Sequence, residues 1–426
     1  MIASTRHALR RLSAFLQDRA GVARSDPAPL LLPPPDRPAR RIEDSLNIPV
    51  VSDSEADAPC AQARLRGMFL ARQERWPDLA QQLHEAESRR TMLCGNWPLT
   101  ELLSFGARSD VVLAVEHALQ EGIAADDPIL LDGVMGLEQV LREHGNDPMI
   151  ALVVAQAHTD IAWAWRGTGW DDAAVSSRNR RRCAAHFDRA AAILAQHCGK
   201  AMNSPSLLAA RCALRAGGRI PRKGLADDYE ALIDMAPGNP AHMRALGTHL
   251  LPGWFGSYPE LELEARRTAA RLTGLWGNGG YCWVMLNAIA LDDGACALVD
   301  VEFFLDGLRD IVAARPDQAM VNYLAAYCAV TLAAGYGTSE EADLARTRIC
   351  DSVNWLVRDH LTELHPLIWA HAAQGFDNNA RVTSPLRFAA RGRADAMQVI
   401  ADLFRDEIAG GKRVTFTPDG PKTSAV

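Results

Sequence analysis

The feature that most constrains this chain is a repeated helix-and-turn unit. Pro148 opens an apolar stretch that closes at Gly167, and Pro316 opens a second stretch that closes at Gly335. Both run 19 residues from Pro to Gly, and each is followed by a turn with an aromatic residue and another glycine. Pro suits the first turn of a helix, and Gly tolerates the positive φ of a helix end. One such unit cannot bury its apolar face alone, so the units must stack.

The rest of the chain follows the same helical pattern. Pro205 and Pro240 each open a helix and lie 35 residues apart, close to the roughly 34-residue tetratricopeptide period. A further helix is expected over residues 98–121, with a break at Gly106, and the only short candidate for a strand is 414–417. We therefore predict an all-α fold, an α-solenoid of stacked antiparallel helix pairs. A closed α/α toroid is the alternative.

Two short motifs carry a resemblance to known proteins. They are AWAWRG at residues 162–167 and LPGWFGS at residues 251–257. Over residues 60–375 the chain resembles tetratricopeptide-like helical repeat proteins, in particular an uncharacterised bacterial family with a Trp-Gly-Gly-Ser-type turn between helices. Gly253 and Phe255 stand where that turn usually has Arg and Gly. The resemblance implies a right-handed helical solenoid and no known reaction.

Composition divides the chain into four parts. Residues 1–20 predict a basic amphipathic helix, in which the apolar side chains of 4–20 share a face and arginines supply the charge. Residues 21–60 are rich in proline and predict a disordered linker. A helical repeat domain is expected over 61–410 and a flexible tail over 411–426. The basic helix could contact a membrane surface, dock on a partner, act as a transit peptide, occupy the protein's own groove, or be idle.

Bulk composition excludes several classes of protein. The chain has 426 residues and a formal net charge of −7, which gives no case for a nucleic-acid surface. Residues 1–41 carry eight basic and three acidic residues, whereas 42–60 carry five acidic and no basic ones. No apolar run approaches the roughly 20 residues that a transmembrane helix needs. Nine cysteines without a CxxC pair fit the reduced thiols of a cytoplasmic protein.

The first helices of tetratricopeptide-like pairs line a concave groove, and this places the binding candidates. Aromatic, Arg, His and Asn side chains there would hold an extended peptide. They are Trp163, Arg166, Arg211, Arg244, His249, Trp283, Asn287, Asn322 and Tyr323. A ridge that could bind an anion or an acidic peptide is expected on the helix 171–198, from Arg178, Arg181, Arg182 and Arg189. The alternative for this ridge is a solvated face.

Other motifs give little support to metal or cofactor chemistry. His242 and His249 share a helix face, but a zinc site needs three or four ligands and the neighbouring positions supply none. His158 lies on a helix that is apolar nearly all round, so we expect a core histidine with a hydrogen bond. The Gly-rich turn 276–281 follows no strand and departs from phosphate-binding loops. We expect no cofactor and no metal.

The prediction is a non-catalytic binding or scaffold protein with a protein or peptide partner. The alternative is a glycoside-active enzyme on an α/α toroid with an aromatic-lined bowl. Such an enzyme needs two converging carboxylates, and the candidates are Asp160, Asp292 and Glu302. Trp254 and Phe255 are expected to fill the seam between two helices rather than to bind a ligand.

Overall fold

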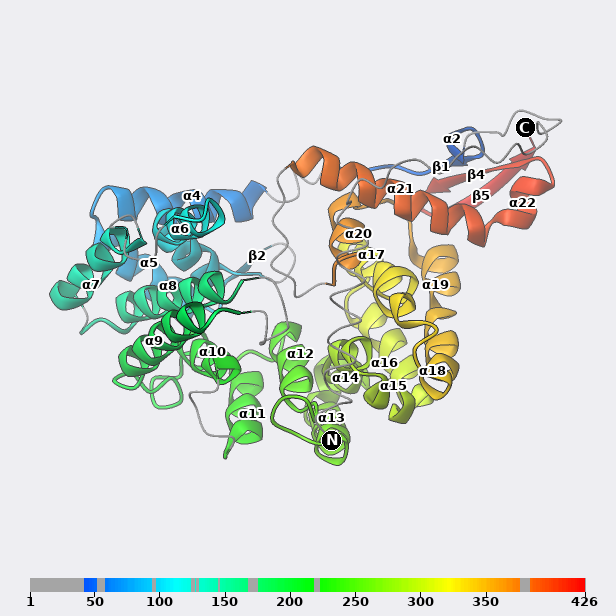
Figure 1. Cartoon of the computed structure of the whole chain (residues 1–426). Helices are drawn as coiled ribbons and strands as arrows, with labels where there is room; N and C mark the ends of the chain where they lie inside the picture. The colour runs from blue at the N-terminus through cyan, green and yellow to red at the C-terminus, as the bar shows by residue number, and fades with distance from the viewer. Residues whose placement is uncertain are drawn as a thin grey trace. The chain divides into compact units, whose positions relative to one another are not determined.

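The computed structural model describes residues 42–51, 58–93, 97–123, 127, 130–144, 146–167, 175–217, 223–375 and 384–425. In this part the chain is mostly helical with a few short strands, which confirms the all-α class (Figure 1). It divides into two compact units, Ser54–Leu275 and Trp276–Val426 with Met1–Asp53. We call them the 54–275 unit and the C-terminal unit. The predicted repeat domain 61–410 is thus divided between two units, and the predicted helix 1–20 lies outside the described residues.

The 54–275 unit is a succession of helices joined by short turns. They are α4 (Ala58–Arg72), α5 (Trp76–Ser88), α6 (Leu99–Gln120), α7 (Asp132–His144), α8 (Pro148–Arg166), α9 (Ser177–Leu194), α10 (Pro205–Ala213), the 3₁₀ turn η3 (Leu214–Gly217), α11 (Leu225–Met235), α12 (Pro240–His249) and all but the last residue of α13 (Tyr258–Trp276). Strands β2 (Met92–Leu93) and β3 (Trp97–Pro98) form a small antiparallel pair before α6. Helices close in sequence pack together, as α8 does with α9 and α10 with α11.

Helix α8 shows how local sequence sets the bounds of a helix. The Asp147 side chain accepts a hydrogen bond from the Met149 N–H at 2.8 Å, and Pro148 occupies the first turn. The helix ends at Gly167, whose φ of 79° lies in the region that favours glycine. Most of its side chains are buried in the core of the unit, which α5, α6, α7 and α9 also line. The predicted Pro-to-Gly helix is confirmed here.

The predicted break of a helix at Gly106 is wrong, because this glycine serves packing. Helix α6 continues through it from Leu99 to Gln120. A Cβ on Gly106 would overlap the carbonyl oxygen of Arg64, and one on Gly67 would overlap that of Leu103. The two glycines therefore let the backbones of α4 and α6 approach closely.

A buried carboxylate binds the first turn of α10 from another helix. Glu87 of α5 accepts hydrogen bonds from the Ser204 hydroxyl at 2.6 Å and from the Ser206 N–H at 2.9 Å. The Ser206 hydroxyl donates to the other carboxylate oxygen of Glu87 at 2.6 Å. The dipole of α10 also stabilises a negative charge at the N-terminal end of this helix. The interaction fixes α5 to α10 within the 54–275 unit.

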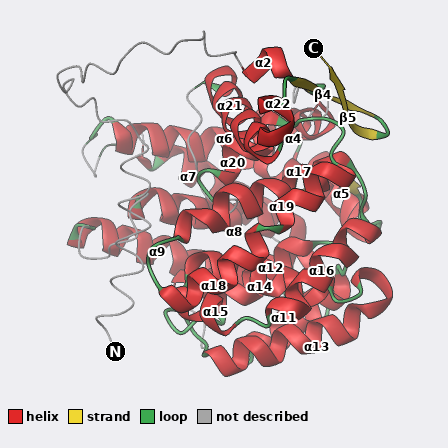
Figure 2. Ribbon diagram, turned by 90° about the vertical axis from the view of Figure 1, so that its right-hand side faces the viewer, coloured by secondary structure: helices red, strands yellow, loops and turns green. Residues whose placement is uncertain are grey.

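The C-terminal unit combines helices with a small sheet (Figure 2). Its helical elements are α2 (Ile42–Ser45), α14 (Gly279–Leu291), α15 (Asp293–Leu298), α16 (Val301–Ala314), α17 (Gln318–Ala326), the π-helix η4 (Tyr327–Leu332), the 3₁₀ turn η5 (Ala333–Gly335), α18 (Glu340–Cys350), α19 (Ser352–Trp355), the π-helix η6 (Leu356–His360), α20 (Pro366–Ala372), α21 (Pro385–Leu403) and α22 (Arg405–Ala409). The second Pro-to-Gly stretch is therefore not a regular α-helix throughout, because α17 passes into η4 and η5 before Gly335.

The sheet contains the predicted strand 414–417, and it corrects part of the predicted disordered linker and part of the predicted flexible tail. Strand β1 (Leu46–Asn47) pairs in parallel with β4 (Lys412–Thr417), which pairs antiparallel with β5 (Gly420–Ala425). Residues 46–47 lie in the predicted linker 21–60, and β4 and β5 lie in the predicted flexible tail 411–426. These segments are ordered because Leu46, Val414 and Phe416 are buried, and the Phe416 ring packs edge-on against Phe404 at 5.9 Å. Among the described residues, no helix has both the length and the apolar character needed to cross a bilayer.

Candidate functional site

The nine predicted groove residues are divided between the two units. Trp163, Arg166, Arg211, Arg244 and His249 belong to the 54–275 unit. The other four, Trp283, Asn287, Asn322 and Tyr323, belong to the C-terminal unit.

Trp163 and Arg166 lie together at the end of α8. The Arg166 guanidinium lies 5.7 Å from the centre of the Trp163 ring, a cation–π contact. The Trp163 ring also meets Phe187 of α9 edge-on at 5.5 Å. Both predicted residues are half-buried, while Arg211 is exposed and Arg244 half-buried on other helices.

His249 lies in an aromatic cluster rather than in an open groove. Its Nδ1 atom and the Tyr229 hydroxyl are 2.8 Å apart, and the rings of Trp254 and Phe255 lie within 6 Å of its own. Burial lowers the pKa of His249 to about 4, with a smaller contribution from the charge of Arg215, so the imidazole is neutral at pH 7. Trp254 and Phe255 pack against His249 of α12, and both are only half-buried.

Two predicted groove residues of the C-terminal unit are instead part of its core. Trp283 is 1% exposed between the rings of Trp276 and Tyr323, and Asn322 is 0% exposed. Helix α14 is apolar almost all round, so its sequence did not indicate which face is turned inward. Asn287 and Tyr323 are half-buried beside them.

Asn322 uses its amide group in four hydrogen bonds. It donates to the carbonyl oxygens of Gln318 at 2.8 Å and Glu363 at 2.9 Å. It accepts from the His365 N–H and the Trp369 Nε1–H, each at 3.0 Å. Its hydrogen-bonding capacity is used within the unit, so the side chain has a structural role.

Two arginines of the predicted Arg ridge on α9 make contacts within the 54–275 unit. Arg189 forms a bidentate pair with Glu138 of α7, at 2.6 and 2.7 Å. Arg182 lies 6.0 Å from the centre of the Trp165 ring. Arg178 and Arg181 are exposed. The four side chains therefore do not present one continuous cationic surface.

Helices α7, α8 and α9 bring together a chain of titratable groups. His158 Nδ1 lies 2.9 Å from His186 Nδ1, and His158 Nε2 lies 3.0 Å from Glu138 Oε1. Burial lowers the pKa of both histidines, that of His186 to about 4, and the Arg189 pair lowers that of Glu138. The expected core histidine with a hydrogen bond is confirmed, but its partners come from two other helices and no local spacing predicts them.

The three carboxylates considered for an enzyme each have a structural partner. Asp160 pairs with the buried Arg108 at 2.6 Å. Asp292 caps α15 by accepting from the Ala295 N–H at 2.8 Å. Glu302 forms an ion pair with Arg348. Asp292 thus caps a helix, Asp160 pairs with a buried arginine, and Glu302 pairs with Arg348 at the surface.

The described residues contain no group of three or more His, Cys, Asp or Glu side chains placed to hold a metal ion. His242 and His249 point to different partners, because His242 Nε2 lies 3.2 Å from Asn239 Nδ2 while His249 contacts Tyr229. The pair therefore does not converge on one point.

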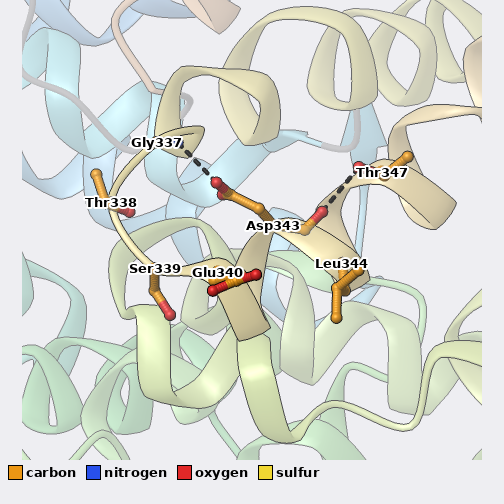
Figure 3. A pocket seen from close by; sticks show the side chains of 7 residues that line it. All are labelled: Gly337, Thr338, Ser339, Glu340, Asp343, Leu344 and Thr347. Carbon is orange, nitrogen blue, oxygen red and sulfur yellow. Dashed lines mark hydrogen bonds between the residues drawn. The ribbon is translucent and has the colours of Figure 1, made fainter.

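A cavity of about 410 Å³ opens at the start of α18 in the C-terminal unit (Figure 3). Its lining is formed by Gly337, Thr338, Ser339, Glu340, Asp343, Leu344 and Thr347. The Ser339 hydroxyl caps the helix by accepting from the Ala342 N–H, and Figure 3 shows Glu340 and Leu344 projecting from the turns that follow. The Tyr336 hydroxyl donates to the Thr347 hydroxyl at 3.4 Å, so Tyr336 adjoins the lining. We call these eight residues the α18 surface.

The α18 surface combines exposed apolar groups with a carboxylate, that of Glu340, which forms no ion pair in the described part of the chain. Leu344 is 69% exposed and Tyr336 is 43% exposed. Asp343 accepts from the Gly337 N–H at 2.8 Å and from Arg346 at 2.9 Å, and these contacts lower its pKa. Within the described residues the Glu340 side chain makes no hydrogen bond or ion pair. Its charge is therefore available to a cation from outside.

The buried Arg346 behind this surface is already neutralised. It is 1% exposed and pairs with Asp343 and with Asp293 of α15, the latter at 2.5 Å. Two carboxylates around one guanidinium leave an excess of negative charge, to which Glu340 adds. The local electrostatic field therefore favours a cation.

Comparisons of the chain with protein-family models, with curated proteins and with solved structures found no match.

Proposed function

We propose that this protein is a non-catalytic, tetratricopeptide-like helical repeat protein that binds a basic, amphipathic segment of a protein partner at the α18 surface. The observation that carries the proposal is the position of Glu340, without an ion pair among the described residues, four residues before the exposed Leu344 beside a cavity. Residues four apart on a helix lie on the same face, so one amphipathic helix can meet both. The packing of successive helices supports a stacked array.

The charge of the surrounding sequence supports the choice of a basic partner. Residues 291–365, which include α15 to α19, contain 13 acidic and five basic residues. Their net charge of −8 exceeds the −7 of the whole chain. Such a field accelerates the association of cationic partners and disfavours acidic ones.

The proposed recognition needs an ionic contact at Glu340 and an apolar contact at Leu344. A single exposed ion pair contributes only about 0–1 kcal/mol, and salt screens it. Burial of the Leu344 side chain against an apolar face adds about 1.5–3 kcal/mol. A partner that offers cations alone, or apolar side chains alone, should therefore bind more weakly than one that offers both.

The free thiols support a reducing compartment as part of the same proposal. Among the described residues, Cys198, Cys212, Cys282, Cys296, Cys328 and Cys350 are free thiols. Burial raises the pKa of the Cys282 and Cys328 thiols, which disfavours the reactive thiolate. We place the protein in the cytoplasm on this ground.

The binding test uses the full-length protein and two synthetic probes. One is a fluorescent Lys/Leu amphipathic peptide as long as residues 4–20, and the other is a Glu/Leu peptide of the same pattern. Fluorescence anisotropy should show binding of the Lys/Leu probe only. Glu340→Lys and Leu344→Asp should each weaken it by about tenfold, a change of about 1.4 kcal/mol.

The matched control is Glu143→Lys, the same charge change at an exposed position of α7. It should leave the affinity unchanged. Equal binding of the two probes, or equal losses in the Glu143 and Glu340 variants, would contradict the proposed site.

A further inference from the structure

The α18 surface and the N-terminal arm of the same chain have opposite charges. Residues 1–41 carry eight basic and three acidic residues, a net charge of +5. They lead directly into α2 of the C-terminal unit, which contacts β4 and α21. The acidic stretch 291–365 belongs to that same unit, and its net charge is −8.

The arm also has the pattern that the proposed site would recognise. Within residues 4–20, apolar side chains recur at helical spacing and arginines flank them. The apolar positions are Ala8, Leu9, Leu12, Phe15 and Leu16, and the basic ones are Arg6, Arg10, Arg11 and Arg19. Leu344 and Tyr336 offer an apolar contact for the first set, and Glu340 offers a carboxylate for the second.

The length of the linker allows the contact. Between residue 20 and residue 42 the chain can extend by roughly 70 Å at about 3.3 Å per residue. A compact unit of this size has a diameter of roughly 40 Å by the scaling of domain size with length. The segment can therefore reach any face of the unit to which it is attached.

We infer that residues 4–20 occupy the α18 surface of their own chain and compete there with the partner segment. The inference rests on the proposed function and adds its regulation. A short tether gives the attached segment an effective concentration in the millimolar range. A segment that binds with a Kd of about 0.1 mM would then weaken the apparent affinity of an external probe by about tenfold.

Cross-linking tests the contact in the full-length protein. A photoreactive benzoyl-phenylalanine replaces Leu12, and mass spectrometry of the monomeric product locates the cross-link. We expect it within residues 336–348 at low salt. The double variant Glu340→Lys with Glu341→Lys should reduce its yield by about fivefold.

Two controls accompany the cross-linking. The same probe at Leu31, in the proline-rich stretch, should give no preference for residues 336–348. Glu143→Lys should leave the yield from position 12 unchanged. Cross-links from position 12 that map elsewhere, or only between chains, would overturn the inference.

A second measurement separates this inference from the proposed function. In the full-length variant with Arg6, Arg10, Arg11 and Arg19 each changed to Gln, the Lys/Leu probe should bind about tenfold more tightly than to the wild type. Equal binding to both proteins, weakened by Glu340→Lys in each, would overturn self-occupancy and leave the proposed function standing. No binding to either protein would contradict the proposed function itself.

Discussion

The Nδ1 atoms of His158 and His186 lie 2.9 Å apart between α8 and α9. The ionised Glu138 accepts from His158 Nε2–H, which leaves the Nδ1 lone pair of His158 to accept from His186 Nδ1–H. This arrangement holds both imidazoles in their neutral form. A proton added to the pair would bring positive charge close to Arg182 and Arg189 in a partly buried site.

The stability of the 54–275 unit should therefore fall in mild acid. The pKa of His186 is lowered to about 4 from an ordinary value of about 6.5, so the unfolded chain binds more protons between these values. The contribution of the neutral His186 to the free energy of unfolding is fully present above pH 6.5 and is lost as the pH falls towards 4. His186→Gln should make the free energy of unfolding, measured in urea, depend less steeply on pH. Gln can still donate to His158 but does not titrate.

The control for the pH dependence is His117→Gln, because His117 has a side chain that is 75% exposed. The variant should show the same pH dependence of the free energy of unfolding as the wild type. Part of the slope will remain in the His186 variant, because burial also lowers the pKa of His242 and His249 to about 4. Identical slopes for wild type and His186→Gln would show that the pair is not buried as described.

Gly106 should tolerate no side chain. In Gly106→Ala the new Cβ meets the backbone carbonyl of Arg64, which cannot rotate away, so the free energy of unfolding should fall by at least about 1–3 kcal/mol. Gly136→Ala in α7 is the control, since nothing lies within 4 Å of a Cβ there. It should be neutral or stabilising by up to about 1 kcal/mol. Equal effects in thermal unfolding would argue against the close α4–α6 crossing.

Asn322 should be indispensable to the stability of the C-terminal unit. Asn322→Ala leaves the Trp369 Nε1–H and the His365 N–H without their acceptor, and each unsatisfied buried group costs about 1–3 kcal/mol. The expected loss is at least about 3 kcal/mol in urea unfolding. Gln398→Ala, at an exposed amide of α21, should change stability by less than about 0.5 kcal/mol. A mild effect at Asn322 would mean that water satisfies these groups.

Local sequence predicted the features that depend on neighbouring residues. Pro148 and Gly167 bound α8 as expected, and Ser257 caps the start of α13 by accepting from the Glu260 N–H at 3.4 Å. Each signal lies within a few residues of the helix end that it marks. The helical class followed from them.

Features that join distant segments could not be predicted in this way. Leu46 pairs with Val414 across most of the chain, and Glu87 caps a helix that begins at Pro205. The sequence also did not indicate that Trp283 points into the core, because α14 is apolar almost all round. For the candidate site, the sequence marked Glu340 only as one of many charges. Its lack of an ion pair in the described chain becomes visible only when the neighbouring helices are placed.

The most direct test of the central claim is hydrogen–deuterium exchange on the full-length variant with the four arm arginines changed to Gln, with and without the Lys/Leu probe. Binding at the α18 surface should slow exchange in peptides that cover residues 336–348, and the added Glu340→Lys change should abolish this protection. Protection confined to another part of the chain, or protection that survives Glu340→Lys, would contradict the account.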